Sequence, residues 1–342
     1  MKGLAWYDKV LFVINSLFGA ALLLSYLLPY IPPKSFNLLS VLSLAVPPLI
    51  MINTIFLVYW LVRLKRQVLL PLVILLIGYN HVTSLYVFSR ETPAEEGVNP
   101  IKVLSYNVRQ FNQFQWSDRD SIPNEISNYI ARQDPDLLTF QEYFRGELEV
   151  ASRFEYKTVQ LKDESDEFGQ AIFSKYPILE YGSLNFPTNS NNNGIYADIA
   201  FPADTLRVIN VHFQSFGIKP DMNNLESAYS KRLFKGMGQT FEIQQEQMEM
   251  VQEVIRESPY RILLMGDFNN TPYSYIYRKL RSMGLQDAHK EKGNGFGRTF
   301  DFDYFPLRID YILPETSIEI LKFETVQVDY SDHFPIHALL RL

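Results

Sequence analysis

The sequence contains no cysteine among its 342 residues. Disulfide bonds, and with them any disulfide partner, are therefore excluded, and so are metal sites built from thiolates. A metal bound by this chain would have to use oxygen and imidazole ligands, and carboxylate and amide oxygens favour Mg²⁺ or Mn²⁺. Histidine is also scarce, with five residues in the whole chain. The absence of cysteine leaves the cellular compartment open.

The larger part of the chain also lacks an excess of positive charge. The first 90 residues contain seven of the 32 basic and one of the 38 acidic residues, which leaves 25 basic against 37 acidic residues in the remainder. A domain that grips long duplex DNA usually presents a basic face, so the acidic balance disfavours this class. A local patch is compatible with it, since Lys231 and Arg232 follow His212 in the chain and Arg298 precedes Asp310. These three cations are either solvated loop residues or substrate-binding residues.

The first 90 residues differ from the rest because they are almost entirely apolar. Long apolar runs extend over Val10 to Ile31, Phe36 to Val62 and Val68 to Phe88, and Pro47-Pro48 interrupts the second. A helix that spans a bilayer needs ~20 apolar residues, and all three runs reach this length. A cleaved signal peptide would account for the first run only. Residues 1–90 are therefore predicted to form a three-helix transmembrane anchor with membrane lipid as its partner.

The basic residues of this anchor predict its orientation. Lys2 and Lys9 precede the first run, three cations fill the link Arg63–Arg66, and the link between the first two runs holds only Lys34. Cytoplasmic loops are enriched in Lys and Arg, so the N-terminus and the Arg63–Arg66 link are expected in the cytoplasm. Three crossings would then place the remainder outside. We expect a multi-pass protein of the cytoplasmic (inner) membrane, with a polar linker at 91–100 and a catalytic domain at 101–342 that is periplasmic or otherwise extracytoplasmic, since the sequence leaves the cell type open.

Beyond the linker, polar side chains stand at the ends of short apolar runs. A buried strand reads as a continuous apolar run, and a polar group at its end is costly unless it is paired, ligated or solvated. The runs that carry such residues are Lys102 to Asn107, Asp136 to Glu142, Val208 to His212, Leu263 to Asn269, Leu307 to Leu313 with Asp310 inside it, and Ser331-Asp332-His333 before Ile336. Carboxylates beside amides and imidazoles are the groups that metal-assisted attack on a phosphate ester requires.

In their order along the chain, these motifs resemble the endonuclease/exonuclease/phosphatase superfamily. The resemblance rests on Asn107, Gln141-Glu142, His212, Gly266-Asp267-Phe268-Asn269, Asp310 and Ser331-Asp332-His333, and it covers roughly residues 100 to 342. It implies an α/β fold, a four-layer α/β/β/α sandwich of the DNase-I-like type, here preceded by the three transmembrane helices. Helices are expected at Ile122 to Arg132, Phe241 to Ser258 and Ser274 to Met283, with strands between them.

The resemblance also implies a division of roles among these residues. Asn107 and Glu142, with Asp332 near them, would hold Mg²⁺ or Mn²⁺. Asp267 would orient or deprotonate the attacking water, and Asn269 and His212 would donate hydrogen bonds to the phosphate oxygens. His333 would stabilise the pentavalent transition state and needs a carboxylate to fix its tautomer; by resemblance this is Asp310, although the sequence leaves open which acid pairs with which imidazole.

Several alternatives stay open. Asp267 and Asn269 fit an Asx turn as well as a catalytic role, and His289 and His337 are expected to be structural. The run Gly293 to Gly297 lacks the pattern of a phosphate-binding loop and is expected to be a loop. The substrate is nucleic acid, a lipid headgroup or a small phosphodiester or phosphate ester, so the enzyme is a nuclease, phosphodiesterase or phosphatase. The alternative is a catalytically inactive receptor of the same fold that binds phosphate-bearing ligands.

Overall fold

The computed structural model describes residues 4–88, 100–144, 152–161, 167–187, 191–217, 227–302 and 304–342, with only the backbone described for 227–231. The described chain forms two compact units. The first contains residues up to Tyr86 together with 218–245 and 271–278, and the second contains the rest. The expected linker at 91–100 lies outside the described residues except for Pro100.

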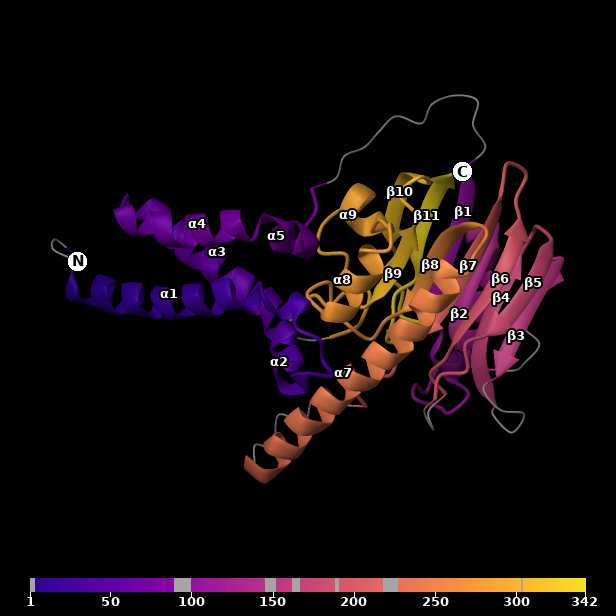
Figure 1. Cartoon of the computed structure of the whole chain (residues 1–342), viewed down its shortest axis with the longest axis horizontal. Helices are drawn as coiled ribbons and strands as arrows, with labels where there is room; N and C mark the ends of the chain where they lie inside the picture. The colour runs from indigo at the N-terminus through magenta and orange to yellow at the C-terminus, as the bar shows by residue number, and fades with distance from the viewer. Residues whose placement is uncertain are drawn as a thin grey trace. The chain divides into compact units, whose positions relative to one another are not determined.

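Helices dominate the first unit (Figure 1), and the long ones near the N-terminus are apolar. They are α1 (Trp6–Ser25), α2 (Asn37–Val41), α3 (Val46–Val62), α4 (Leu69–Ile77) and α5 (Tyr79–Leu85). Hydrogen bonds between polar side chains connect α1 to α3. Tyr59 donates a 2.7 Å hydrogen bond to Asp8, and Trp60 Nε1 donates one of 3.0 Å to Asn15. The start of α1 therefore lies beside the end of α3, so these two helices run antiparallel.

Two stretches of this unit, Trp6–Tyr30 and Asn37–Val62, are long and apolar enough to cross a membrane. The third expected helix is not a single straight one. Arg66–Ile77 and Tyr79–Leu85 meet at a bend of 80°. The bend falls at Gly78, where a Cβ atom would lie 2.0 Å from the Tyr26 hydroxyl oxygen, so only glycine lets Tyr26 pack against the break.

Two mixed β-sheets form the second unit (Figure 1). The six-stranded sheet has the order β10-β11-β1-β2-β4-β3 and the five-stranded sheet the order β5-β6-β7-β8-β9. The strands are β1 (Ile101–Asn107), β2 (Leu137–Phe144), β3 (Tyr156–Leu161), β4 (Phe168–Ser174), β5 (Ile178–Ser183), β6 (Gly194–Ala200), β7 (Thr205–His212), β8 (Arg261–Asp267), β9 (Asp310–Pro314), β10 (Glu319–Thr325) and β11 (Ile336–Arg341). This is the α/β fold with two sheets that the sequence predicts.

One hydrophobic core lies between the two sheets. Val103, Leu137 and Ile172 from the six-stranded sheet cluster with Val208 and Leu263 from the five-stranded sheet, and all are fully buried. A second cluster joins the other face of the six-stranded sheet to α6 (Ile122–Gln133), whose apolar side chains recur at the spacing of helical turns. The buried runs in the sequence are therefore strands that are covered on both faces.

The remaining helices agree with the predictions except in one respect. α6 and α8 (Tyr275–Arg281) lie where the sequence predicts them, and a short α9 (Ala288–Lys292) follows. The helix expected to begin at Phe241 instead begins at Ser227 and ends at Arg256, which makes α7 30 residues long. Gly236 and Gly238 disfavour a helix interior and so indicate a loop before Phe241, whereas in the structure this part continues the helix.

Candidate active site

The candidate site lies in the second unit, where polar strand ends of both sheets meet. β1 and β2 are parallel and place Asn107 opposite Gln141, and β7 and β8 are parallel and place His212 opposite Asp267. β9 runs antiparallel to β8, so its first residue pairs with the last residue of β8, Asp267 with Asp310. The sequence places Asp310 inside a strand; it is in fact the first residue of β9, because the preceding residues Leu307 to Ile309 lie outside that strand.

The backbone conformation and burial around the motif Gly266-Asp267-Phe268-Asn269 explain its residue types. Gly266 has φ +128°, and a Cβ there would lie 2.1 Å from the Val211 carbonyl oxygen of the neighbouring strand. Phe268 is fully buried against Phe213. Asn269 has φ 48°, a left-handed conformation that asparagine tolerates better than most residues. The chain therefore turns sharply after β8 and holds Asp267 at the end of the strand.

Asp267 is the centre of the site. Its Oδ1 accepts the Asn269 N–H at 2.7 Å, and its Oδ2 accepts the Asn107 Nδ2 at 3.0 Å, so it links the two sheets. The Nε2 atoms of His212 and His333 lie 3.5 and 3.6 Å from the same Oδ2. Burial raises the pKa of Asp267 to about 7, and the charge of Asp310 adds to this effect while that of His333 opposes it. The geometry thus surrounds one carboxylate with two imidazoles and two amides.

His333 and Asp310 form a buried pair. The Nδ1 of His333 lies 3.0 Å from Oδ2 of Asp310, and the ring of Phe300 packs edge-on against the imidazole at 4.9 Å between centroids. Burial by itself would lower the pKa of His333, but the charges of Asp310 and Asp267 outweigh it and raise the pKa to about 10. This imidazole is therefore protonated at neutral pH. The acid beside its Nδ1 is Asp310, a pairing that the sequence left open.

His212 differs from His333 in its charge state. Burial and the positive charge of His333 lower the pKa of His212 to about 3, so this imidazole is neutral at neutral pH. Its Nε2 also lies 3.8 Å from Oε1 of Glu142. The site therefore contains one charged and one neutral imidazole, which suits two different tasks in the same reaction.

A β-bulge brings Glu142 into the site. The register between β2 and β4 shifts between Phe140 and Tyr143, and Glu142 has φ 52°. Such a bulge turns a side chain away from its regular direction. Gln141 points into the interior instead, where its Nε2 donates a 2.6 Å hydrogen bond to Asn210 of β7 and braces the two sheets. Of the pair Gln141-Glu142, only the glutamate therefore faces the other site residues.

Glu142 and its neighbours offer oxygen ligands. Its Oε1 accepts Asn107 Nδ2 at 3.4 Å, Gln110 Nε2 donates to its Oε2, and burial raises its pKa. Asp332 forms an ion pair with Arg109 at 3.2 Å, and its charge contributes to the raised pKa of Glu142. A carboxylate whose pKa is raised by burial and by a neighbouring carboxylate is a favourable ligand for a divalent cation, and this all-oxygen set suits Mg²⁺ or Mn²⁺.

Asp267, Asp310 and His333 are a second group that could hold a metal, with ligand atoms within 4.8 Å of one another. The ion pair between His333 and Asp310 weighs against this. A protonated imidazole has no lone pair to offer a metal, and the pKa of His333 is raised to about 10. A cation at this group would have to displace the proton of His333, whereas the Glu142 side offers oxygen ligands only.

Of the predicted substrate-binding cations, only Arg298 belongs to the same unit as this network. Arg298 donates to Asp301, and its guanidinium stacks on the ring of Phe334 at 5.4 Å. Arg232 is exposed on α7 in the first unit, and only the backbone of Lys231 is described. Their role in substrate binding stays a prediction.

Sequence reasoning missed the loop that follows β1. Arg109, Gln110, Phe111 and Asn112 all have positive φ, which is unusual for a run of residues other than glycine. Through this loop Arg109 reaches Asp332 and Gln110 reaches Glu142. The short spacing of Arg109 from Asn107 is the only signal in the sequence that could have identified it.

The comparisons with known proteins agree with this geometry. A family model described as the endonuclease/exonuclease/phosphatase family matches residues 104–333, and one described as a domain of unknown function (DUF8431) matches residues 8–85. No curated protein matches the sequence.

Several solved structures share the fold. An endonuclease/exonuclease/phosphatase from Beutenbergia cavernae is 15% identical, with a TM-score of 0.53 over 72% of this chain and 72% of its own. D. rerio TDP2 complexed with single strand DNA product is 16% identical, with a TM-score of 0.52 over 72% of this chain and 100% of its own. A mannosyl-6-phosphatase from Bacteroides thetaiotaomicron is 19% identical, with a TM-score of 0.50 over 71% of this chain and 100% of its own. With a family model that matches most of its length, this chain belongs to the endonuclease/exonuclease/phosphatase family.

Proposed function

We propose that the protein is a metal-dependent phosphoesterase that is anchored in a membrane with its catalytic domain on the outer face. The main support for a hydrolase is the network around Asp267, in which a neutral His212, a protonated His333 and two amides surround one carboxylate. Hydrolysis of a phosphate ester needs a base or orienting group for water and donors for the phosphate oxygens.

Each side chain has a task in this scheme. Asp267, with its pKa raised to about 7, accepts a hydrogen bond or a proton from the attacking water. Asn269 and the neutral His212 donate hydrogen bonds to the non-bridging oxygens. The protonated His333, held by Asp310, places positive charge where negative charge develops in the transition state.

Mg²⁺ or Mn²⁺ would be held by Glu142 and Asn107, with Asp332 close by. When bound, the cation neutralises charge on the phosphate and helps to orient it. The arrangement also supports an active enzyme over an inactive phosphate-binding receptor. Each residue type that the chemistry requires is present, and contacts of 2.7 to 3.8 Å join these residues into one network around Asp267.

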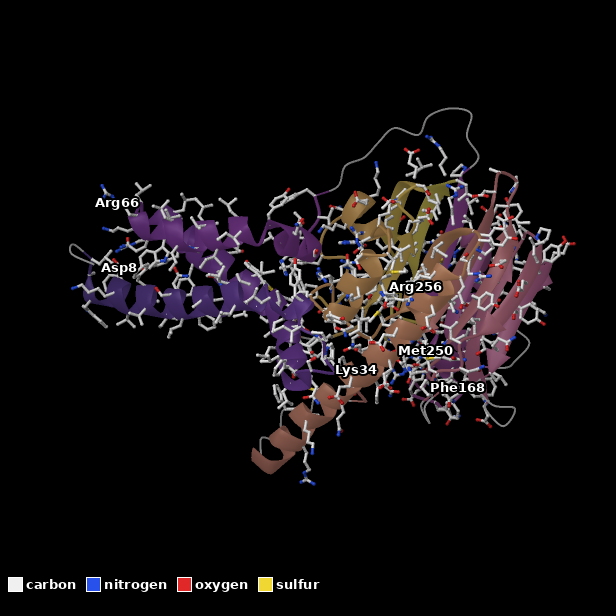
Figure 2. The ribbon with its side chains drawn as sticks, viewed as in Figure 1. Asp8, Lys34, Arg66, Phe168, Met250 and Arg256 are labelled. Atoms are coloured by element: carbon white, nitrogen blue, oxygen red, sulfur yellow. The ribbon has the colours of Figure 1, made fainter. Side chains whose placement is uncertain are left out.

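Contacts inside the first unit support the orientation. Asp8 and Arg66 lie at one end of its apolar helices and Lys34 at the other (Figure 2). Lys34 N donates to Gln245 Oε1 at 3.0 Å, so α7 lies on the same side of the membrane as the link between the two spans. The chain must therefore return to that side after Arg66, and the bent pair Arg66–Ile77 and Tyr79–Leu85 acts as a broken third crossing. By the positive-inside rule the cytoplasm lies at the Asp8 end.

Protease accessibility tests this topology. In spheroplasts that keep an intact membrane, protease added outside should digest the second unit and leave the Arg63–Arg66 link protected. A catalytic domain that stays protected until the membrane is permeabilised would overturn the outward placement.

The substrate class is a choice between nucleic acid and a smaller phosphate ester. Of the structural relatives, one is a complex with single strand DNA product and another a mannosyl-6-phosphatase. The acidic balance of residues 91–342 favours a lipid headgroup or a small phosphate ester over long nucleic acid. The test is the full-length protein in detergent with Mg²⁺ or Mn²⁺, assayed on DNA, RNA, phospholipid and sugar phosphates beside the Asp267→Asn variant. The proposed activity would be contradicted if the wild-type protein hydrolysed none of these substrates, or if it hydrolysed them no faster than the Asp267→Asn variant.

A further inference from the structure

We propose that the N-terminal half of α7 lies at the membrane surface and binds the headgroups of anionic lipids through Arg232 and Lys235. This inference rests on the membrane anchoring proposed above, but it concerns a surface that neither the family nor the catalytic site explains.

The link between the two spans gives the level of the membrane surface. A chain that leaves one span at Tyr30 and enters the next at Asn37 keeps residues 31–36 at one face of the membrane. Tyr30 and Phe36 flank this link with 60% and 62% of their surface exposed. Aromatic residues at the ends of spans are typical of the headgroup level. The link therefore marks the height of the bilayer surface within the first unit.

Three contacts fasten α7 to this link. Gln245 accepts the backbone N–H of Lys34 at 3.0 Å, and Glu242 accepts Asn37 Nδ2 at 2.7 Å. One helical turn earlier, a Cβ at Gly238 would lie 3.2 Å from the Asn37 side chain, so the helix backbone itself approaches the link closely. Two turns of α7 are thus held at the level of the membrane surface.

A second element meets the same region. The guanidinium of Arg278 on α8 lies 3.9 Å from the ring centroid of Tyr30. Tyr273 donates a hydrogen bond to the His81 carbonyl at 3.3 Å, and its ring stacks on that of His81. Segments 218–245 and 271–278 of the first unit therefore each contact its apolar helices, the former through α7 and the latter through Tyr273 and Arg278.

The composition of the N-terminal half of α7 suits an anionic surface. Residues 227–241 contain three cations, Lys231, Arg232 and Lys235, and no acidic residue, within a chain whose part beyond residue 90 has 25 basic and 37 acidic residues. Arg232 and Lys235 are exposed one turn apart, and Phe234 beside them is 38% exposed. Cations with an exposed aromatic residue on one helix are the pattern of a helix that lies in the interface.

The absence of native cysteine allows a direct test with single-cysteine probes in the full-length protein. An environment-sensitive dye at Phe234→Cys would be followed in nanodiscs of phosphatidylcholine with increasing phosphatidylglycerol and with nitroxide-labelled headgroups. We expect quenching that grows with the phosphatidylglycerol fraction. The double variant Arg232→Glu with Lys235→Glu should raise the phosphatidylglycerol fraction at half-maximal quenching at least fivefold, because each cation is attracted to the anionic surface. The matched control Arg256→Glu with Lys157→Glu, which reverses two exposed cations of the second unit, should change it little.

A probe at Leu17→Cys, in the middle of α1, separates the lipid-binding surface from the anchor. If a nitroxide on the acyl chain quenches Leu17→Cys while Phe234→Cys is unquenched at every lipid composition, the anchor stands and the lipid-binding surface is refuted. The lipid-binding surface is also refuted if the charge reversals in α7 and in the control act equally. If Leu17→Cys is unquenched, the membrane anchoring fails and the lipid-binding surface fails with it.

Discussion

Two buried charged clusters of the second unit contrast in composition. On β6 and β7, Asp198 and Arg207 form a bidentate pair with two hydrogen bonds of 2.7 Å, and the guanidinium also lies 4.5 Å from the ring of Tyr196. One acid meets one base, and both are almost fully buried. In the candidate site, Asp267 and Asp310 share the single protonated imidazole of His333.

The difference shows how burial alone fails to distinguish structure from function. The paired cluster satisfies its charges internally, so removing it should cost stability. The site keeps an excess of carboxylate. Burial, with a smaller contribution from neighbouring carboxylates, raises the pKa of both Glu142 and Asp267, and a divalent cation would offset this cost. Variants of the site should therefore lose activity, whereas variants of the paired cluster should lose stability.

Removal of divalent cations should have the largest effect. Excess EDTA should abolish phosphoesterase activity and added Mg²⁺ or Mn²⁺ should restore it, because the oxygen ligands then carry uncompensated charge. Glu142→Gln should weaken the divalent-ion affinity measured by activation curves, whereas Glu180→Gln on exposed β5 should not. Full activity in excess chelator would rule out the metal-dependent mechanism.

Changes in the Asp267 network should follow. His333→Ala and Asp267→Asn should each lower kcat at least ~10²-fold, since each removes a transition-state interaction. Circular dichroism should show that the fold is kept. Asp198→Asn in the paired cluster serves as the control and should keep most of the activity. Wild-type turnover in both site variants would show that the site is wrongly assigned.

The paired cluster should respond in stability instead. Asp198→Ala leaves Arg207 buried without its carboxylate and should lower the free energy of unfolding by about 3–5 kcal/mol. Denaturant titration of the full-length protein measures this loss. The double variant Asp198→Leu with Arg207→Leu should recover much of it, and a double variant as unstable as the single one would argue against the charge as the cause.

The smallest effect should come from Thr299. Its Oγ1 accepts the N–H groups of Ile309 and Asp310 at 2.9 and 3.1 Å and thus fixes the start of β9. Thr299→Val should cost about 1–3 kcal/mol of stability and lower kcat modestly by loosening the His333–Asp310 pair. Thr299→Ser should restore both, and a Ser variant as impaired as Val would point to packing of the methyl group.

The sequence predicted the strand ends and the residues that meet there, because apolar runs with polar ends follow directly from burial on both faces. It could not predict the bulge at Gln141-Glu142, which depends on how β4 pairs with β2. The left-handed run after β1 and the bend at Gly78 likewise depend on contacts distant in sequence, with Glu142 and with Tyr26. The part of α7 before Phe241 was missed because Gly236 and Gly238 are unfavourable inside a helix, and the close approach of Gly238 to Asn37 is a tertiary contact that the sequence does not show.

The left-handed backbone of Glu142 sets stability against function at this position. A residue with a side chain costs about 1–2 kcal/mol in this conformation relative to glycine, which adopts it freely. Glycine at this position would relieve the backbone but would remove the carboxylate from the site. The fold therefore holds this carboxylate in place at a cost in stability.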